Sequence, residues 1–509
     1  MLGAVRRGRL TWGAMTYKST PMLIAAAALM LATGGCDSSG TANQLKPISA
    51  PDFAASLRGR VTTDAMMAHL TKLQDIAKAN GNTRAVGTAG YEASVDYVVG
   101  KLRDNGFEVQ TPEFDARVFH SDPGSVTVAD KKFEARALEF SPATPPVGVT
   151  GPLVSVPVNA SPGCNASDYD NLPVNGAVVL VDRGTCPFAQ KESAAAQRGA
   201  VAVVLADNVV EEQMGGTLGE TNADVKIPVL SVTKADGALL RTTAGPATVQ
   251  LSAEAKTIHA RNVIAQTKTG SSSDVVMAGA HLDSVTEGPG INDNGSGVAA
   301  VLETALQLGS SPGVHNAVRF GFWGAEELGL IGSRKYVESL DLNALKDIAL
   351  YLNFDMLASP NPGYFTYDGD QSLPLDQRGS PVVPEGSAGI ERSFAAYLNS
   401  AGKTPQDTAF DGRSDYDGFT VAGIAAGGLF SGAEVKETQD EAKLWGGAAD
   451  QPFDPNYHKD TDTLDHIDRT ALGINGGGVA YVTGLYAQDL SGRNGIPVRA
   501  DRTRHTLSK

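Results

Sequence analysis

Histidine and carboxylate side chains recur at the ends of strand-like segments in the second half of this chain. The segments "VVMAGAHLD", "VRFGFWGAEE" and "LYLNFD" are apolar runs that stop at imidazole or acidic groups. The residues at or near such places are His281, Asp283, Asp293, Glu326, Glu327, Asp355 and His458. Imidazole and carboxylate groups that converge from different elements bind zinc, and a catalytic zinc ion keeps a coordination position open. The pattern therefore favours a catalytic metal site.

Each cluster has a simpler explanation when it is taken alone. The pair Glu326 and Glu327 can be a solvated surface pair, and a strand-end carboxylate such as Asp355 can cap a turn. His466 lies shortly after His458 and is a rival ligand. The remaining histidines belong to no cluster and are interpreted as surface or structural residues: His69, His120, His259, His315 and His505. Repetition at several strand ends is what favours the metal site.

The elements that must position these residues alternate between strands and helices. In residues 257–492, strand-like "NVIAQTK", "DVVMAGAHL", "AVRFGFWG", "IALYLNFDM" and "IAAGGLF" are separated by helical "GVAAVLETALQLG", "GSRKYVESL" and "AGIERSFAAYLNSAG". This alternation predicts an α/β fold with a mixed, mostly parallel sheet and helices on both faces. Ligands bind at the carboxyl ends of the strands in such sheets. Residues 56–120, which open with helical patterns, are assigned to the same domain.

Residues 121–256 have a different texture, with short β-branched runs such as "SVTVAD", "GAVVLVDRG" and "AVAVVLADN". They predict a compact β-rich domain inserted between the two parts of the first. This domain contains Cys164 and Cys186, the even pair that remains when Cys36 is set aside. In an oxidising compartment the pair can form a disulfide, and two buried free thiols are the alternative.

The N-terminal residues 1–36 predict an export signal. The basic residues Arg6, Arg7, Arg9 and Lys18 precede the apolar run "MLIAAAALMLATGG", which ends before Cys36. A basic region, a short apolar run and small residues before a cleavage point are typical of a secretory signal. The small residues before Cys36 resemble a bacterial lipobox, so Cys36 is a predicted lipidation site; ordinary signal cleavage is the alternative. We expect an exported lipoprotein that faces outward from the cell membrane, with some of it released.

Length and charge limit the remaining functions. A chain of 509 residues is long enough for two or more domains. Its net charge of −15 argues against a nucleic-acid partner, because phosphate backbones are bound by basic patches. Residues 37–55 are interpreted as a polar linker and residues 493–509 as a polar tail. We expect a monomer.

Five motifs in order resemble those of a known enzyme family. "AGAHLDSVTEGPGINDNGSGVAAVLETA", "VRFGFWGAEELGLIGSRKYV", "LNFDM", "DGRSDYDGF" and "FDPNYHKDTDTLDHID" look like the motifs of secreted bacterial aminopeptidases with two zinc ions, of the aminopeptidase S and aminopeptidase Y type. "VNGAVVLVDRGTCPFAQKESAAAQRGAVAVVLADN" resembles the protease-associated (PA) domain. The resemblance covers nearly the whole chain after the signal and is strongest to mycobacterial-type lipoprotein aminopeptidases. It implies the zinc exopeptidase fold with an inserted PA domain.

The resemblance implies a ligand set for two Zn²⁺ ions. In the family pattern one carboxylate bridges the ions, and each ion has a histidine and a further carboxylate of its own. The matching residues here are Asp293 as the bridge, His281 and Asp355 on one ion, and Glu327 and His458 on the other. Two Zn²⁺ ions carry a charge of +4 against −3 from the carboxylates, so a bridging hydroxide would make the cluster neutral.

The resemblance also implies catalytic roles near the ions. Glu326 corresponds to the general base that activates the bridging hydroxide. Asp283 corresponds to the carboxylate that orients His281, as is usual for a ligating imidazole. Tyr457 matches a residue that polarises the scissile carbonyl, and Arg413 falls where the family lines the substrate pocket. The implied reaction is the release of N-terminal amino acids, large and apolar by family habit, from peptides or proteins.

One departure from the family concerns the loop around His458. Related enzymes often carry a cysteine pair that flanks the final histidine, where this chain has Asn456 and Thr461. We expect the loop to be looser, although no ligand is missing. Asp462 and Asp465 are interpreted as residues that cap or solvate the following turn.

Two other functions fit parts of the same pattern. The first is a catalytically silent receptor or binding lipoprotein, which the complete ligand set and Glu326 argue against. The second is another enzyme on the same fold, either a metallo-carboxypeptidase or an aminoacyl cyclase. A carboxypeptidase needs a cationic pocket for a C-terminal carboxylate, and Arg413 is the candidate within the motifs.

Overall fold

The computed structural model describes residues 48–159, 161–210, 214–219, 224–379, 383–491 and 495–507. The predicted signal segment, Cys36 and the first part of the predicted linker lie outside the described residues. Within the described ranges, no helix has both the length and the apolar composition needed to cross a membrane.

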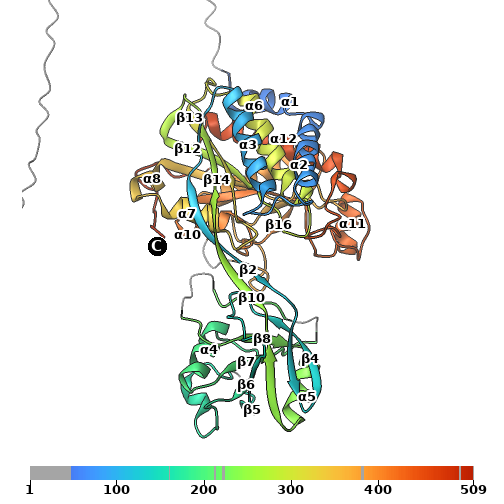
Figure 1. The fold of residues 1–509 in the computed structure, drawn as a ribbon. Helices are drawn as coiled ribbons and strands as arrows, with labels where there is room; N and C mark the ends of the chain where they lie inside the picture. Colours follow the sequence, from blue (N-terminus) through green and yellow to red (C-terminus); the bar gives the residue numbers. More distant parts are fainter. Residues whose placement is uncertain are drawn as a thin grey trace, which may run out of the picture. The chain divides into compact units, whose positions relative to one another are not determined.

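An eight-stranded mixed sheet forms the centre of the larger domain (Figure 1). Its four middle strands, in the order β13-β12-β14-β17, are parallel, and antiparallel pairing occurs nearer the edges. In spatial order the strands are β1 (Glu108–Gln110), β11 (Val263–Gln266), β13 (Asn316–Trp323), β12 (Ser271–His281), β14 (Ile348–Phe354), β17 (Ala425–Phe430), β15 (Phe365–Tyr367) and β16 (Gln406–Thr408). The mostly parallel sheet predicted from the alternation of strands and helices is confirmed.

Helices cover both faces of this sheet (Figure 1). Successive strand residues point to opposite sides, and both sides of the middle strands carry apolar residues that must be buried. On β12, Val276 and Ala278 join one hydrophobic core, whereas Met277 between them joins another. The first core is completed by α1 (Ala50–Arg60), α2 (Thr63–Ala79), α3 (Ala89–Asp104), α6 (Gly297–Leu308), α9 (Ser387–Ser400) and α12 (Arg469–Gln488). The second is completed by α7 (Ile331–Glu338), α8 (Leu342–Asp347) and α10 (Tyr416–Val421).

Two helices differ from the sequence predictions. The predicted linker extends to residue 55, but α1 already begins at Ala50, where the Ser49 side chain accepts a hydrogen bond from the Asp52 amide. Helix α12 has no counterpart in the prediction, because its glycines weaken a helical pattern. These glycines allow close packing: a Cβ on Gly476 would lie 2.4 Å from Sδ of Met66. Tertiary contact therefore stabilises a helix that composition disfavours.

The C-terminal residues are packed rather than loose. Arg502 is buried and donates hydrogen bonds to the carbonyl oxygens of Pro497, Ser273 and Lys346. It also pairs with Asp274, with 2.6 Å between Nη2 and Oδ1. The interpretation of residues 493–509 as a simple polar tail is therefore wrong for this part, because a buried arginine fastens it to β12 and α8.

The second domain is a closed seven-stranded barrel. Its strands, in spatial order, are β3 (Gly124–Val128), β4 (Lys131–Ala137), β8 (Val229–Val232), β7 (Ala202–Ala206), β6 (Val178–Asp182), β5 (Val149–Ser155) and β9 (Pro246–Gln250). Helices α4 (Phe188–Gln197) and α5 (Lys234–Thr242) pack on it. A disulfide joins Cys164 to Cys186, as the sequence predicted. An antiparallel ribbon of β2 (Glu113–Ser121) and β10 (Ala253–Arg261) carries the chain from the larger domain into the barrel and back.

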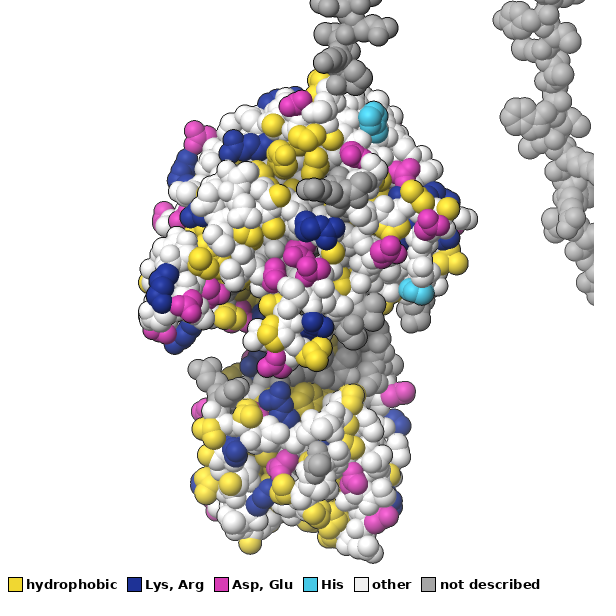
Figure 2. Space-filling model, turned by 180° about the vertical axis from the view of Figure 1, so that it is seen from behind, with side chains coloured by type: hydrophobic (Ala, Val, Ile, Leu, Met, Phe, Trp, Pro, Cys, Tyr) yellow, Lys and Arg dark blue, Asp and Glu magenta, His cyan; other side chains and the backbone are white. Residues whose placement is uncertain are grey.

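The surface agrees with the charge of the sequence. On the face seen in Figure 2, Lys and Arg side chains are scattered among acidic and neutral ones. This face is therefore mixed in charge, in a chain whose net charge is −15.

Candidate metal centre

The predicted site residues meet at the carboxyl ends of the parallel strands. His281 is the last residue of β12, and Asp355 directly follows β14. Glu326 and Glu327 lie in the turn after β13. Asp293 lies in a helical turn (Ile291–Ser296) that leads into α6, and His458 lies in the loop before α12. Separate elements therefore supply imidazole and carboxylate groups to one place, as the strand-end pattern predicts.

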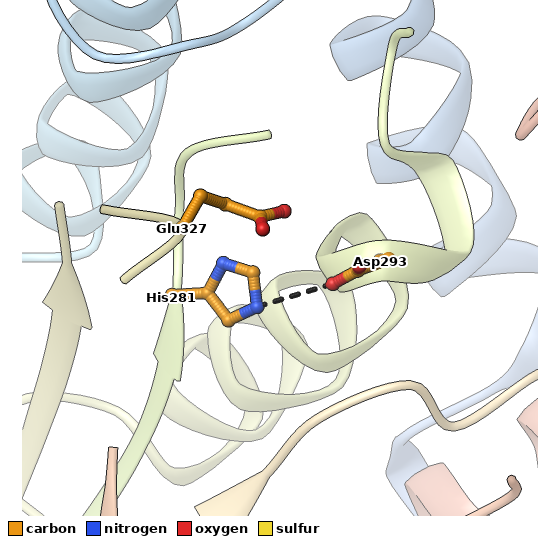
Figure 3. A group of neighbouring side chains, drawn as sticks. All are labelled: His281, Asp293 and Glu327. Atoms are coloured by element: carbon orange, nitrogen blue, oxygen red, sulfur yellow. Dashed lines mark ion pairs between the residues drawn. The ribbon is translucent and has the colours of Figure 1, made fainter. Parts of the chain in front are cut away.

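The carboxylate of Asp293 stands between two groups of side chains. Its Oδ1 atom lies 3.2 Å from Nε2 of His281, and its Oδ2 atom lies 3.2 Å from Nε2 of His458. His281 Nε2 is also 3.3 Å from Oδ1 of Asp355, and His458 Nε2 is 3.1 Å from Oε2 of Glu327. Figure 3 shows the side chains of His281, Asp293 and Glu327 pointing toward a common centre. Each oxygen of Asp293 thus faces its own histidine–carboxylate pair.

These separations suit metal ions. A tetrahedral zinc ion with bonds of about 2.0–2.1 Å holds its ligand atoms about 3.3 Å apart. The measured nitrogen-to-oxygen distances are close to that value on both sides of Asp293. The Oε1 atom of Glu327 is buried and has no hydrogen-bond partner. A buried carboxylate oxygen without a partner is costly, and a cation would satisfy it.

The electrostatics also suit bound cations. Burial alone would lower the pKa of His281, but the charges of Glu326 and Asp355 outweigh burial and raise it well above its usual value. The pKa of His458 is likewise raised, to about 10: burial lowers it, and the hydrogen bonds to Asp293 and Glu327 more than offset this. Burial raises the pKa of Glu327 to about 7. The carboxylates therefore favour a positive charge on both imidazoles, and cations would compete with protons for the same nitrogen atoms.

Asp283 has a different partner from the one expected. Its Oδ1 atom lies 3.7 Å from Nδ1 of His281, too far for a hydrogen bond, and the backbone oxygen of Asp283 is nearer, at 3.2 Å. The two carboxylate oxygens instead accept hydrogen bonds from the backbone amides of Glu326 and Glu327, each at 3.3 Å. Asp283 therefore fixes the turn that carries both glutamates, and its backbone orients the imidazole.

Asn294 connects the segments that carry Asp293 and Asp355. Its Oδ1 atom accepts hydrogen bonds from the amides of Met356 and Gly297, and its Nδ2 donates to the carbonyl oxygen of Phe354. Because Phe354 and Met356 flank Asp355, one buried side chain holds the segments of Asp293 and Asp355 together. This role of Asn294 was not predicted from the sequence, although the residue lies within "INDNGSG".

Asp462 connects the loop of His458 to the loop of Asp293. It is buried, and its carboxylate accepts hydrogen bonds from the amides of Asn292 and Asp293 at 2.7 and 3.0 Å. The interpretation of Asp462 as a solvated or capping residue of the next turn is therefore wrong. These contacts tie the loop of His458 to the loop of Asp293. Asp454 adds a second tie by accepting a hydrogen bond from Nδ2 of Asn292.

A pocket of about 270 Å³ opens beside the group of side chains around Asp293. Glu326 lines it, whereas Glu327 does not appear among its lining residues. Its apolar walls come from Met356, Phe365, Tyr367, Ala409, Tyr416, Phe430, Ala433, Val435 and Phe453. Its acidic lining residues, besides Asp293, Glu326 and Asp355, are Asp411, Glu434 and Glu441. The pocket thus combines a large apolar surface with negative charge.

The two remaining predicted residues, Arg413 and Tyr457, both line this pocket. Arg413 pairs with Glu434 at 2.8 Å and donates to the hydroxyl oxygen of Tyr457 at 3.3 Å. The ring of Tyr457 stacks on that of His458, with centroids 3.8 Å apart. The rival ligand His466 is exposed and bonds to the carbonyl oxygen of Thr461, so the structure does not bring it to the group around Asp293.

Comparison with known proteins identifies the family. Residues 262–483 match the model of peptidase family M28, and residues 149–240 match that of the PA domain. A Mycobacterium tuberculosis protein named probable lipoprotein aminopeptidase LpqL is 72% identical over 97% of this chain and 100% of its own length. The chain belongs to peptidase family M28.

Other similar proteins are aminopeptidases by name. An aminopeptidase of Pseudomonas aeruginosa is 41% identical over 81% of this chain and 79% of its own. Among solved structures, an aminopeptidase from Aneurinibacillus sp. strain AM-1 superimposes with a TM-score of 0.69 at 26% identity, covering 86% of this chain and 96% of its own. A zinc aminopeptidase from Bacillus subtilis gives a TM-score of 0.57 at 25% identity over 88% and 98%. The zinc exopeptidase fold with an inserted PA domain is thereby confirmed.

Proposed function

We propose that this protein is a zinc-dependent aminopeptidase that binds two Zn²⁺ ions. The observation that carries the proposal is the position of Asp293, whose two oxygens each face a separate histidine–carboxylate pair. Names of similar proteins, including aminopeptidases and a zinc aminopeptidase, support the same activity. The proposed ligands are His281, Asp293, Glu327, Asp355 and His458.

The proposed mechanism assigns proton transfer to Glu326. Bound zinc ions supply a Lewis acid that polarises the scissile carbonyl and lowers the pKa of water. Glu326 lines the pocket, and its Oε2 atom lies 3.9 Å from Nε2 of His281. From there the carboxylate accepts a proton from the attacking water and donates it to the leaving amine. The hydroxyl of Tyr457, also in the pocket, donates to the carbonyl oxygen on which negative charge develops.

The pocket supports substrates with an apolar N-terminal residue and a free α-ammonium group. Aromatic and aliphatic walls favour a large apolar side chain such as that of leucine. Acidic side chains around the same space favour the ammonium group. Arg413 is already paired with Glu434, so its charge is not free to bind a C-terminal carboxylate as a carboxypeptidase would require.

A pair of measurements tests this function. We expect hydrolysis of a leucyl chromogenic substrate and no hydrolysis of its N-acetylated form, with about two zinc ions bound per chain. Equal rates on both substrates would exclude an aminopeptidase, and a protein that binds zinc but cleaves neither would be the silent binding protein.

Two neighbouring variants test the assignment of roles. Glu326→Gln should lower kcat by about 10²–10⁴ while the protein keeps its zinc, because only a proton acceptor is removed. Glu327→Gln is the matched comparison and should lose zinc, because a ligand is weakened. Loss of zinc in the first variant and retention in the second would reverse the two roles.

We also propose that the protein is exported and attached to the membrane through a lipid on Cys36, acting outside as a monomer on peptide or protein N-termini. The similarity to a protein named as a lipoprotein supports this. Cys36→Ala should abolish incorporation of labelled fatty acid and move the enzyme from the membrane fraction to the medium. Labelling that persists in the variant would place the lipid elsewhere.

A further inference from the structure

A buried arginine lies inside the loop that separates His281 from Asp293. Arg84, from the segment between α2 and α3, has no exposed surface. Its guanidinium donates to three carbonyl oxygens of this loop. They belong to Leu282, to Pro289 at 2.8 Å and to Gly290 at 2.6 Å. The fork of one side chain therefore holds the beginning and the end of the loop together.

The backbone around Arg84 strengthens the same contact. The amide of Arg84 donates to Oγ of Ser284 at 3.0 Å, and Oγ1 of Thr83 donates to the carbonyl oxygen of Val285 at 2.9 Å. Gly290 has a φ of +59°, and a Cβ there would lie 2.3 Å from the carbonyl oxygen of Asp293. The loop thus folds tightly around the guanidinium, in a conformation that a larger residue at position 290 would disturb.

The charge of Arg84 lies close to carboxylates of the proposed zinc site. The guanidinium donates to carbonyl oxygens, and among the negative charges that act on it are those of Asp293 and Glu327. By Coulomb's law alone, a buried cation so near the site opposes the binding of Zn²⁺. By geometry, the same cation favours binding, because it fixes the distance between two ligands. The two effects predict opposite results when the residue is changed.

We propose that Arg84 is a positioning residue for zinc, which sets the spacing of His281 and Asp293 by joining Leu282 to Gly290. The proposal rests on the two-zinc site proposed above. The effect of these hydrogen bonds on zinc affinity outweighs the repulsion by the charge of Arg84, so loss of the guanidinium weakens zinc binding. Lysine at this position would keep the charge but offer a single ammonium, which cannot reach both ends of the loop in the planar geometry of a guanidinium.

Zinc affinity of the metal-free protein tests the proposal without relying on turnover. Arg84→Lys and Arg84→Gln are compared with the native protein by competition with a zinc chelator. Arg60→Gln, on the exposed side of α1, is the matched control. We expect at least ten-fold weaker binding of zinc in Arg84→Lys, weaker still in Arg84→Gln, and no change in the control. Hydrogen exchange of the amides of residues 284–288 and of Gly290 should become faster in both Arg84 variants.

Kinetics separate positioning from general damage. With excess zinc, KM for a leucyl substrate should stay within two-fold of the native value, because the pocket walls come from other elements, while kcat falls. Zinc affinity in Arg84→Lys equal to the native value, or tighter binding in Arg84→Gln, would overturn the proposal. If Arg84→Gln does not fold, Arg84→Lys alone decides. A native protein that binds fewer than two zinc ions would instead refute the function proposed above.

Discussion

Replacing Asn294 by alanine should destabilise the larger domain severely. The side chain bonds to the amides of Gly297 and Met356 and to the carbonyl oxygen of Phe354, all in buried surroundings. A buried backbone group left without a partner costs about 1–3 kcal/mol, so three such groups cost about 3–9 kcal/mol. Folded domains are stable by only about 5–15 kcal/mol, so the variant should lie close to the limit of folding.

Tryptophan fluorescence provides a selective assay for this loss. The chain has three tryptophans, of which Trp12 lies in the predicted signal and Trp323 and Trp445 lie in the larger domain. In the mature protein, urea unfolding followed by tryptophan fluorescence therefore reports on that domain and not on the barrel. Measurements on the zinc-free protein keep metal binding out of the result.

The control is Asn399→Ala, which removes an exposed side chain of the same type in α9. It should change the free energy of unfolding by no more than about 0.5 kcal/mol. A loss of less than about 1 kcal/mol in Asn294→Ala, below what one unpaired buried group costs, would refute the reasoning. It would mean that water or a shift of the backbone satisfies the three groups at once.

Two further predictions concern other parts of the molecule. Replacing Cys164 and Cys186 together by serine should destabilise the barrel by about 3 kcal/mol on the chain-entropy model, because the bridge closes a loop with a sequence separation of 22. Limited proteolysis of the barrel measures this loss, and unchanged resistance to the protease would contradict it. Burial raises the pKa of Glu391 to about 7 from its usual 4.5, so its contribution to stability is present below pH 4.5 and is lost as the pH rises through 7. Glu391→Gln should therefore make the unfolding free energy of the zinc-free protein fall less steeply between pH 4.5 and 7, and parallel curves for the two proteins would disprove the link.

The sequence was informative where chemistry and strand ends coincide. His281 and Asp355 could be placed together because both end apolar strand patterns, and parallel strands end at the same edge of a sheet. The alternation of strands and helices also predicted β11, β12, β13, β14 and β17 of the sheet and the helices α6, α7 and α9, but not the short strands β15 and β16. In both cases a local pattern was enough to determine the outcome.

The supporting residues could not be predicted in this way. Arg84 contacts a loop about two hundred positions further along the chain, and Asp462 reaches back to Asn292 over a similar distance. Nothing in the local sequence distinguishes a buried arginine or aspartate from a solvated one. Arg502 and helix α12 were missed for the same reason, since burial against distant elements determines their structure.

The ribbon of β2 and β10 has a consequence for the order in which the chain folds during synthesis. Ser121 and Ala253 lie opposite each other in this ribbon, so the barrel is one continuous stretch of chain that begins and ends at the same point. It can fold as soon as that stretch has emerged. Helices α1 to α3 are made earlier, but the core that buries them also needs α6 and α12. The barrel is therefore able to fold before the loop of residues 282–290, which Arg84 contacts, has been synthesised.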